Sequence, residues 1–156
     1  FHGDLHPGNC IVDPNGKFVF IDNGAICHAP KKVAHALFHF FDHLSRQEMQ
    51  QAFDALLAMT EVNPTPKKLA KYYATMTEIY TDFEKKPVGE QSLTRIMMKT
   101  VKAAVEHAGA NFGEEAFPII RALMYLDGLV IRTHPDALLI QSMGPFLEEF
   151  KTKLNI

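Results

Sequence analysis

Residues 2–9 read His-Gly-Asp-Leu-His-Pro-Gly-Asn, and residues 22–24 read Asp-Asn-Gly. Between them lie two short runs rich in β-branched and aromatic residues, 10–12 and 18–21. The runs are separated by Asp-Pro-Asn-Gly at 13–16, a sequence that favours a tight turn. We therefore predict a β-hairpin at the start of the chain.

The predicted hairpin brings two polar residues together. Asn9 precedes the first strand and Asp22 follows the second, so both should lie at neighbouring strand ends. Asp4 lies five residues before Asn9, on a loop that contains Pro and Gly. Two carboxylates and an amide oxygen are ligands that suit Mg²⁺. All of these residue types also favour ordinary turns, which is the competing interpretation.

The rest of the chain has helical periodicity, so we predict a mainly α fold with a small N-terminal β-hairpin. A capping box at 45–48 should start one helix, and Ser92 should cap another that ends at Gly109. Gly144-Pro145 should kink or split the last helix. The expected helices cover 30–44, 46–62, 65–83, 92–109, 114–132 and 135 onward.

Composition limits the class of protein. The chain has 156 residues, of which 47% are hydrophobic and 22% charged, so it can form a single packed domain or one lobe of a larger one. A net charge of −2 gives no electrostatic footprint for nucleic acid. No apolar run is long enough to span a membrane, and two cysteines favour a reducing compartment, such as a bacterial cytoplasm or an organelle matrix. The start lacks a signal peptide and an initiator Met, so a fragment or a processed product is expected.

Other groups of residues have weaker functional interpretations. His35, His39 and His43 share one helical face and could bind a transition metal, although a partly exposed amphipathic face is favoured. An aromatic stripe over 72–83 is expected to be core rather than a lipid groove, and the lysines at 67–71 are expected to be a solvated face rather than a membrane contact. Asp127-Gly128 is interpreted as a close-packing site within a helix.

The spacing His2-x-Asp4-x-x-x-x-Asn9, followed by Asp22-x-Gly24, is that of the catalytic loop and metal aspartate of kinase-like phosphotransferases. The stretch 1–9 resembles both the aminoglycoside and choline phosphotransferases and the UbiB protein-kinase-like family. The C-terminal part favours UbiB. The stretches that carry this second resemblance are Arg121-Ala122-Leu123, Leu126-Asp127-Gly128, His134-Pro135-Asp136 and 144–149.

The resemblance implies roles for the residues of the motif. Asp4 would be the catalytic aspartate, Asn9 and Asp22 would hold Mg²⁺, and His6, Asn9, Asp22 and Gly24 would contact ATP. The chain would be the catalytic-loop and magnesium-binding half of a UbiB-type kinase or ATPase that supports ubiquinone or isoprenoid-lipid metabolism. Asn23 departs from the family, which usually has Phe at that position.

The resemblance also sets the expected organisation. Residues 1–156 would form a kinase-like C-lobe, with the catalytic loop, hairpin and Asp-x-Gly turn in 1–26 and the helical part in 30–156. The N-lobe of a kinase would be absent, so the chain alone should be inactive. It should associate with that lobe or with itself, and contact with a lipid or membrane surface is possible by resemblance. A small-molecule phosphotransferase and a non-catalytic, pseudokinase-like module are the alternatives.

Overall fold

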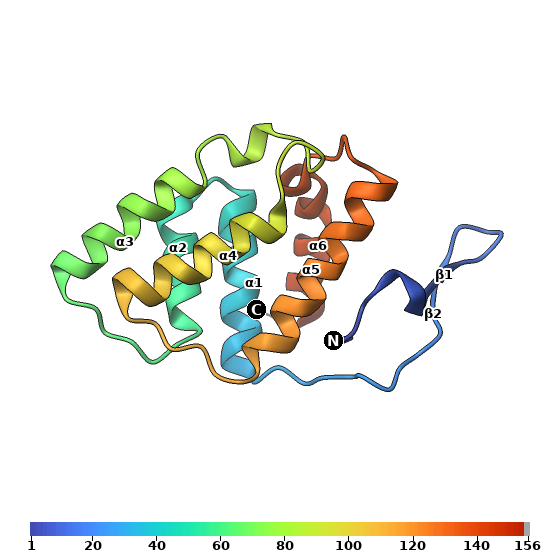
Figure 1. Cartoon of the computed structure of the whole chain (residues 1–156), viewed down its shortest axis with the longest axis horizontal. Coiled ribbons are helices and arrows are strands. Elements are labelled where there is room, and N and C mark those ends of the chain that lie inside the picture. The colour runs from blue at the N-terminus through green and yellow to red at the C-terminus, as the bar shows by residue number, and fades with distance from the viewer. Residues whose placement is uncertain (155–156) are drawn as a thin grey trace.

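The computed structural model describes residues 1–154, which form a small N-terminal hairpin beside a bundle of helices (Figure 1). The predicted mainly α fold with an N-terminal hairpin is confirmed. In chain order the elements are η1 (Pro7–Asn9), β1 (Cys10–Val12), β2 (Phe18–Phe20), α1 (Lys31–Ser45), α2 (Met49–Ala58), α3 (Pro66–Ile79), η2 (Phe83–Lys85), α4 (Leu93–Ala103), η3 (Ala104–Ala108), α5 (Ala116–Thr133) and α6 (Leu139–Leu154).

The hairpin forms as the sequence predicts. Strands β1 and β2 are antiparallel, with Cys10 opposite Phe20 and Val12 opposite Phe18. In the turn, Asp13 Oδ1 accepts hydrogen bonds from the backbone N–H groups of Asn15 and Lys17, each at 2.8 Å. The turn therefore fixes the strand register through one side chain and the local backbone.

The main core lies among α1, α2, α3 and α4, and its largest fully buried side chains include Phe53, Tyr72 and Met76. Burial of apolar side chains drives this packing, and the hydroxyls of Tyr72, Tyr80 and Thr100, which are buried in it, are satisfied. Tyr72 donates to the Phe53 carbonyl at 2.9 Å, and the hydroxyls of Tyr80 and Thr100 lie 3.1 Å apart. The aromatic stripe predicted as core is core.

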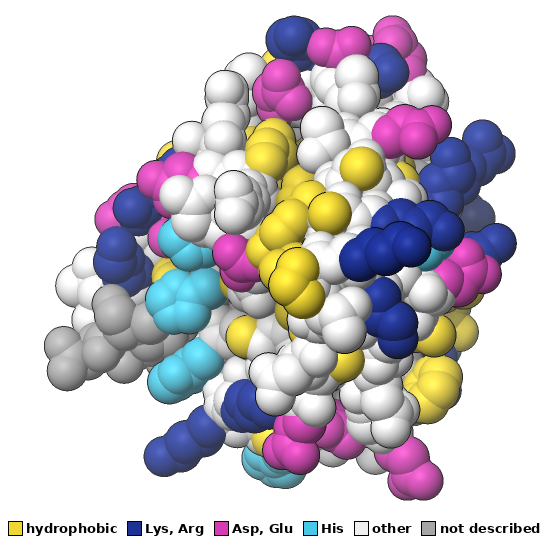
Figure 2. Space-filling view, turned by 90° about the vertical axis from the view of Figure 1, so that its left-hand side faces the viewer, with side chains coloured by type: hydrophobic (Ala, Val, Ile, Leu, Met, Phe, Trp, Pro, Cys, Tyr) yellow, Lys and Arg dark blue, Asp and Glu magenta, His cyan; other side chains and the backbone are white. Residues whose placement is uncertain are grey.

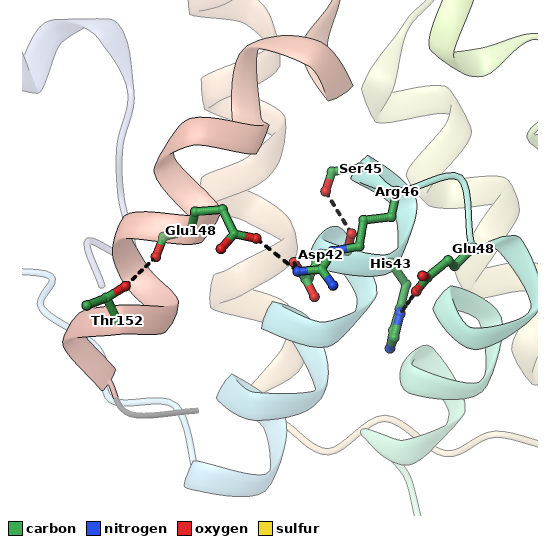
Figure 3. A network of polar contacts seen from close by, with 7 residues as sticks. All are labelled: Asp42, His43, Ser45, Arg46, Glu48, Glu148 and Thr152. Carbon is green, nitrogen blue, oxygen red and sulfur yellow. Dashed lines mark hydrogen bonds and ion pairs between the residues drawn. The ribbon is translucent and has the colours of Figure 1, made fainter.

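Helix termini give one confirmed prediction and one correction. Ser92 Oγ accepts a hydrogen bond from the Arg95 N–H at the start of α4, as expected. The capping box at 45–48 is wrong, because α1 continues through Ser45, whose Oγ donates to the Asp42 carbonyl (Figure 3). Glu48 instead pairs with His43 across the α1–α2 turn, at 2.6 Å. The Glu48 carboxylate therefore pairs with His43 rather than with the backbone N–H of Ser45, as a capping box would require.

Of the kink or split predicted for the last helix at Gly144-Pro145, the split is wrong, because α6 is continuous through Pro145, and the kink stays a prediction. Proline removes one backbone hydrogen bond, but α6 packs against α1. Arg46 on the α1 end bridges Asp42, at 3.0 Å, and Glu148 of α6, at 2.9 Å (Figure 3). Packing between the helices outweighs the lost bond.

Asp127-Gly128 is not the close-packing site that the sequence suggests. A Cβ added at Gly128 would meet no atom within 4 Å. Asp127 is the only buried residue of α5 among those described, and its Oδ2 accepts from the Thr94 N–H and hydroxyl, at 3.0 and 2.7 Å. The pair therefore ties α5 to the start of α4. Over residues 1–154, every helix is too short or too polar to cross a membrane.

Candidate functional site

The site is built on two chain segments that run antiparallel, 1–9 and 21–27. The Gly3 N–H donates to the Ala25 carbonyl at 2.7 Å, and the Cys27 N–H donates to the Phe1 carbonyl at 2.9 Å. At the other end, the Ile21 N–H donates to the Asn9 carbonyl at 3.1 Å. The loop 4–8 and the turn 22–24 are therefore held side by side between these bonds.

Gly3 is required by the close approach of the two segments. A Cβ at this position would overlap Cys27 Sγ and would lie 3.0 Å from the Ala25 carbonyl oxygen. Both atoms belong to the facing segment, and the second is backbone that has little freedom to move. Glycine is thus the residue that lets the pairing form.

His2 joins the loop to the turn with a single ring. Its Nε2 lies 2.6 Å from the Asp22 carbonyl oxygen, and its Nδ1 accepts from the Asp4 N–H at 3.3 Å. Because Nδ1 is the acceptor, the ring proton is on Nε2 and is donated to Asp22. The ring also lies against Phe20, with 5.6 Å between the ring centroids. The motif histidine therefore positions the backbone on both sides of the site.

Asn9 and Asp22 occupy the neighbouring strand ends that the hairpin predicts. Asn9 is buried, and its Nδ2 donates to the Asp4 carbonyl at 3.1 Å, which fixes the orientation of the amide. Asp22 is exposed, and its Oδ1 accepts from the Gly24 N–H at 2.8 Å. Oxygens remain on both side chains after these bonds are made, so a hard cation is chemically suited to this end of the hairpin.

His6 shapes the loop from within. Its Nδ1 accepts from the Gly8 N–H at 3.0 Å, so the neutral ring carries its proton on Nε2. That nitrogen lies 3.9 Å from Asp4 Oδ2. A Cβ at Gly8 would come within 2.8 Å of the His6 ring, so this glycine makes room for the histidine. The result is a loop in which His6 faces the candidate catalytic carboxylate.

Helix α5 is the part of the bundle that holds the loop, and the motif analysis did not find it. Arg121 Nε donates to the Gly3 carbonyl at 2.9 Å. One turn later on the same helix, Tyr125 packs edge-on against the His6 ring at 5.9 Å. The i, i+4 spacing of the two residues was visible in the sequence, but nothing in it indicated their partners.

The sequence suggested two metal sites, one on the α1 histidines and one at Asn9 and Asp22, and their outcomes differ. In the part of the chain that the structure describes, no three His, Cys, Asp or Glu side chains gather closely enough to hold a metal ion. Histidines line one edge of the face in Figure 2, but His43 is engaged by Glu48, and His39 stacks on His43 at 6.1 Å. The α1 histidines are therefore interpreted as a partly exposed helical face. The Asn9–Asp22 magnesium site, which uses an amide oxygen, stays a prediction.

Residues 1–56 match a family described as the ABC1 atypical kinase-like domain. Over 96% of its length the chain is 25% identical to a "Probable protein kinase UbiB" of Blochmanniella pennsylvanica. A protein of the same name from Aliivibrio salmonicida is 26% identical over 98% of the chain. "Protein ACTIVITY OF BC1 COMPLEX KINASE 3, chloroplastic" of Arabidopsis thaliana is 24% identical over 94%.

The chain spans 28% of the length of each of the two UbiB relatives and 20% of the length of the Arabidopsis protein. No solved structure matches it. The family match covers the loop, the hairpin and the Asp-x-Gly turn, and the similarity to the UbiB proteins continues through the helices. The chain is therefore similar to the ABC1 atypical kinase-like domain over residues 1–56 and to proteins named UbiB over most of its length.

Proposed function

We propose that this chain supplies the catalytic loop and the magnesium-binding half of a UbiB-type atypical kinase or ATPase. The observation that carries the proposal is the His2 ring, which bonds to the Asp4 N–H on one side and to the Asp22 carbonyl on the other. Phosphoryl transfer depends mainly on positioning and on charge stabilisation. A single side chain that fixes the loop and the metal-binding turn together serves that requirement.

The residues present fit the magnesium and ATP that the relatives imply. Asn9 and Asp22 offer oxygen ligands at adjacent strand ends, and Asp22 is open to solvent, which leaves room for phosphate oxygens and water. When bound, Mg²⁺ would neutralise charge on the transferring phosphate. Asn9 would be held for this task by its bond to the Asp4 carbonyl, and Asp22 by its bond to the Gly24 N–H. His6 and Gly24 would border the nucleotide.

Asp4 has the role of proton acceptor in this proposal. Its carboxylate would take the proton from the attacking hydroxyl group or water, as the corresponding aspartate does in kinases. The His6 Nε2–H lies 3.9 Å from Oδ2, so Oδ1 is left for the nucleophile. Arg121 acts as a positioning residue, because it holds the Gly3 carbonyl just before Asp4.

The substrate follows only from the relatives. We propose that the whole protein acts in ubiquinone or another isoprenoid-lipid pathway, with the other part of the kinase fold completing the nucleotide site. ATPase activity stimulated by isoprenoid lipids would support this, whereas phosphorylation of choline or an aminoglycoside would favour the small-molecule alternative. A non-catalytic module is favoured by one observation: Asn23 is exposed where the family places a packing Phe.

The test is Asp22→Asn in the whole protein. Asn keeps an oxygen to accept from the Gly24 N–H, so the turn should form, but the ligand charge is lost. We expect ATP affinity in Mg²⁺ to fall at least tenfold, which corresponds to about 1.4 kcal/mol, and affinity without Mg²⁺ to stay the same. Titration of nucleotide with and without Mg²⁺ measures both.

Asp13→Asn is the matched control, because Asp13 caps a turn in the same way but lies at the far end of the hairpin. It should leave both affinities unchanged. Equal Mg²⁺ dependence in Asp22→Asn and the unmodified protein would contradict the assignment. Tight Mg²⁺-dependent binding without any turnover in the unmodified protein would favour the non-catalytic module.

A further inference from the structure

His6 places a hydrogen-bond donor near the carboxylate of Asp4. The His6 Nε2–H lies 3.9 Å from Asp4 Oδ2, which is longer than a hydrogen bond. The two side chains are 40% and 36% exposed, so burial does not fix either of them. A small rotation of the His6 ring would therefore close this gap or widen it, and the contacts that hold the ring decide how the candidate catalytic carboxylate is presented.

Within the loop, the His6 ring is held along one edge only. Its Nδ1 accepts the Gly8 N–H at 3.0 Å, as the N-cap of η1. The neighbouring ring atom, Cε1, occupies space that a Cβ at Gly8 would enter, at 2.8 Å. Both contacts come from the same residue and lie on the same side of the ring. The hydrogen bond fixes one ring atom, and the tilt of the ring about that atom must be restrained by another contact.

Tyr125 of α5 supplies a contact from outside the loop. The centroids of the Tyr125 and His6 rings are 5.9 Å apart and their planes meet at 70°, a T-shaped arrangement that aromatic pairs favour. Within residues 1–154, Tyr125 is the only aromatic ring that packs on His6. One turn earlier, the bond from Arg121 to the Gly3 carbonyl fixes α5 beside the same loop. The tilt of the His6 ring is therefore set by the position of α5.

Core packing does not explain why a tyrosine ring lies at this position. Tyr125 is half-buried and lies outside the core cluster, in contrast to Tyr72 and Tyr80, which are buried in that cluster with their hydroxyls paired. Loss of the Tyr125 ring should therefore disturb the loop more than the fold.

We propose that Tyr125 is a positioning residue for phosphotransfer, a role that rests on the proposed function, in which Asp4 accepts the proton. Tyr125 holds the His6 ring so that its Nε2–H is directed to Asp4 Oδ2, and Oδ1 stays open to the attacking hydroxyl group or water. Catalytic hydrogen bonds that are long without substrate often shorten in the complex, so the 3.9 Å gap is compatible with this role. Tyr125 itself touches no reacting atom and acts through His6.

Tyr125→Leu in the whole protein tests this role through the kinetics of ATP turnover. Leucine removes the ring but keeps an apolar side chain that favours a helix. We expect kcat to fall about tenfold because the carboxylate is misplaced, while the KM for ATP and the melting temperature stay the same. Tyr125→Phe keeps the ring and should restore kcat. Phe117→Leu makes the same kind of change at a 68% exposed ring of the same helix and is the matched control, with no effect expected.

A double variant tests whether Tyr125 acts through His6. His6→Asn keeps an oxygen that can accept the Gly8 N–H at the N-cap but removes Nε2, so kcat should fall while the loop still forms. Residues that act as a unit have non-additive effects, so His6→Asn with Tyr125→Leu should have the kcat of His6→Asn alone. Losses that multiply in the double variant would overturn the assignment. A loss that persists in Tyr125→Phe, or one that Tyr125→Leu shows equally in kcat, KM and melting temperature, would also overturn it.

NMR of the whole protein labelled with ¹⁵N-histidine gives a second readout that does not depend on turnover. Correlations between the ring nitrogens and the ring carbon-bound protons show which nitrogen of His6 carries the proton. We expect the Nε2–H form alone in the unmodified protein, and a mixture with the Nδ1–H form in Tyr125→Leu. Unchanged His6 signals in Tyr125→Leu would overturn the inference even if kcat falls. If the unmodified protein turns over no ATP but the His6 signals do change, the proposed function fails, and Tyr125 still positions His6.

Discussion

The N-terminal segment 1–27 and the helical bundle are held together by different forces. The bundle buries large side chains such as Phe53, Tyr72 and Met76 in a common core. In the segment 1–27 all large apolar side chains except Leu5 stay 43–57% exposed, and the chain is held by backbone hydrogen bonds and by His2. The residues so exposed are Phe1, Ile11, Val12, Phe18, Val19, Phe20, Ile21 and Ile26.

Because of this difference, the contacts that stabilise the fold are not the contacts that shape the candidate site. The burial of apolar side chains that drives folding occurs in the bundle. The geometry of the loop depends instead on hydrogen bonds between residues at most 27 positions apart, together with the contacts that Arg121 and Tyr125 make with the loop. We expect the exposed hairpin to pack on another lobe of the kinase fold or on a second copy of the chain. Variants in each region should therefore affect different measurements.

The largest effect should come from Phe53→Ala. Phe53 is 1% exposed at the centre of the core, so truncation leaves a cavity as well as losing apolar contacts. We expect the free energy of unfolding of the chain to fall by about 3–5 kcal/mol, measured by urea denaturation. Phe18→Ala makes the same chemical change at a side chain that is 56% exposed, and should cost under about 1 kcal/mol. Equal losses in the two variants would show that the hairpin belongs to the core.

A second test uses alkaline pH, which acts on the bundle through Tyr80. Burial raises the pKa of Tyr80 from its ordinary value of 10.0 to about 12, although the bond to Thr100 opposes the shift. Above pH 10 the unfolded chain loses the tyrosine proton first, so stability present below pH 10 is lost as the pH rises to about 12. The loss from Tyr80 amounts to about 3 kcal/mol.

Tyr80→Phe checks this assignment. The variant has no proton to lose at that position, so its free energy of unfolding should fall less between pH 10 and 12 than that of the unmodified chain. It should still fall, because burial also raises the pKa values of Tyr72 and Tyr73. Tyr125→Phe, which alters a half-buried ring outside the core, is the comparison. An identical pH dependence in Tyr80→Phe and the unmodified chain would contradict the prediction.

The smallest effect should come from Arg121→Gln, which acts on the link between the two regions. Arg121 is exposed and its Nε bonds to the Gly3 carbonyl, so its loss should loosen the loop by about 1 kcal/mol. We expect amide hydrogen exchange over residues 2–9 to become about fivefold faster, while exchange in α2 and α3 is unchanged. Arg132→Gln, at an exposed position near the end of α5, should change neither. Faster exchange throughout the bundle would mean that Arg121 supports the whole fold.

Local patterns in the sequence predicted most of the fold. The turn at 13–16 and the Ser92 cap depend on residues a few positions apart, and both are confirmed. The capping box at 45–48 failed because His43 competes for Glu48, and the last helix is not split at Pro145, where α6 packs against α1. Both failures come from partners outside the short window that a pattern covers.

The candidate site shows the same limit. The hairpin register predicted that Asn9 and Asp22 lie at neighbouring strand ends, and the Ile21–Asn9 bond places their backbones there. The anchor from Arg121 to Gly3 joins residues 118 positions apart, and the Thr94–Asp127 contact joins residues 33 apart. Periodicity indicates which face of α5 is apolar, but it does not indicate which distant backbone group a polar residue will reach.

The close approach at Gly3 has a consequence for sequence variation. Shortening Cys27 would relieve only one of the two contacts that a side chain at position 3 would make. The other contact is with the Ala25 carbonyl oxygen, which accepts the Gly3 N–H and so cannot move away without breaking that pairing. Position 27 should therefore accept substitutions independently of position 3, whereas position 3 should remain glycine in every descendant sequence that keeps the loop and the turn paired.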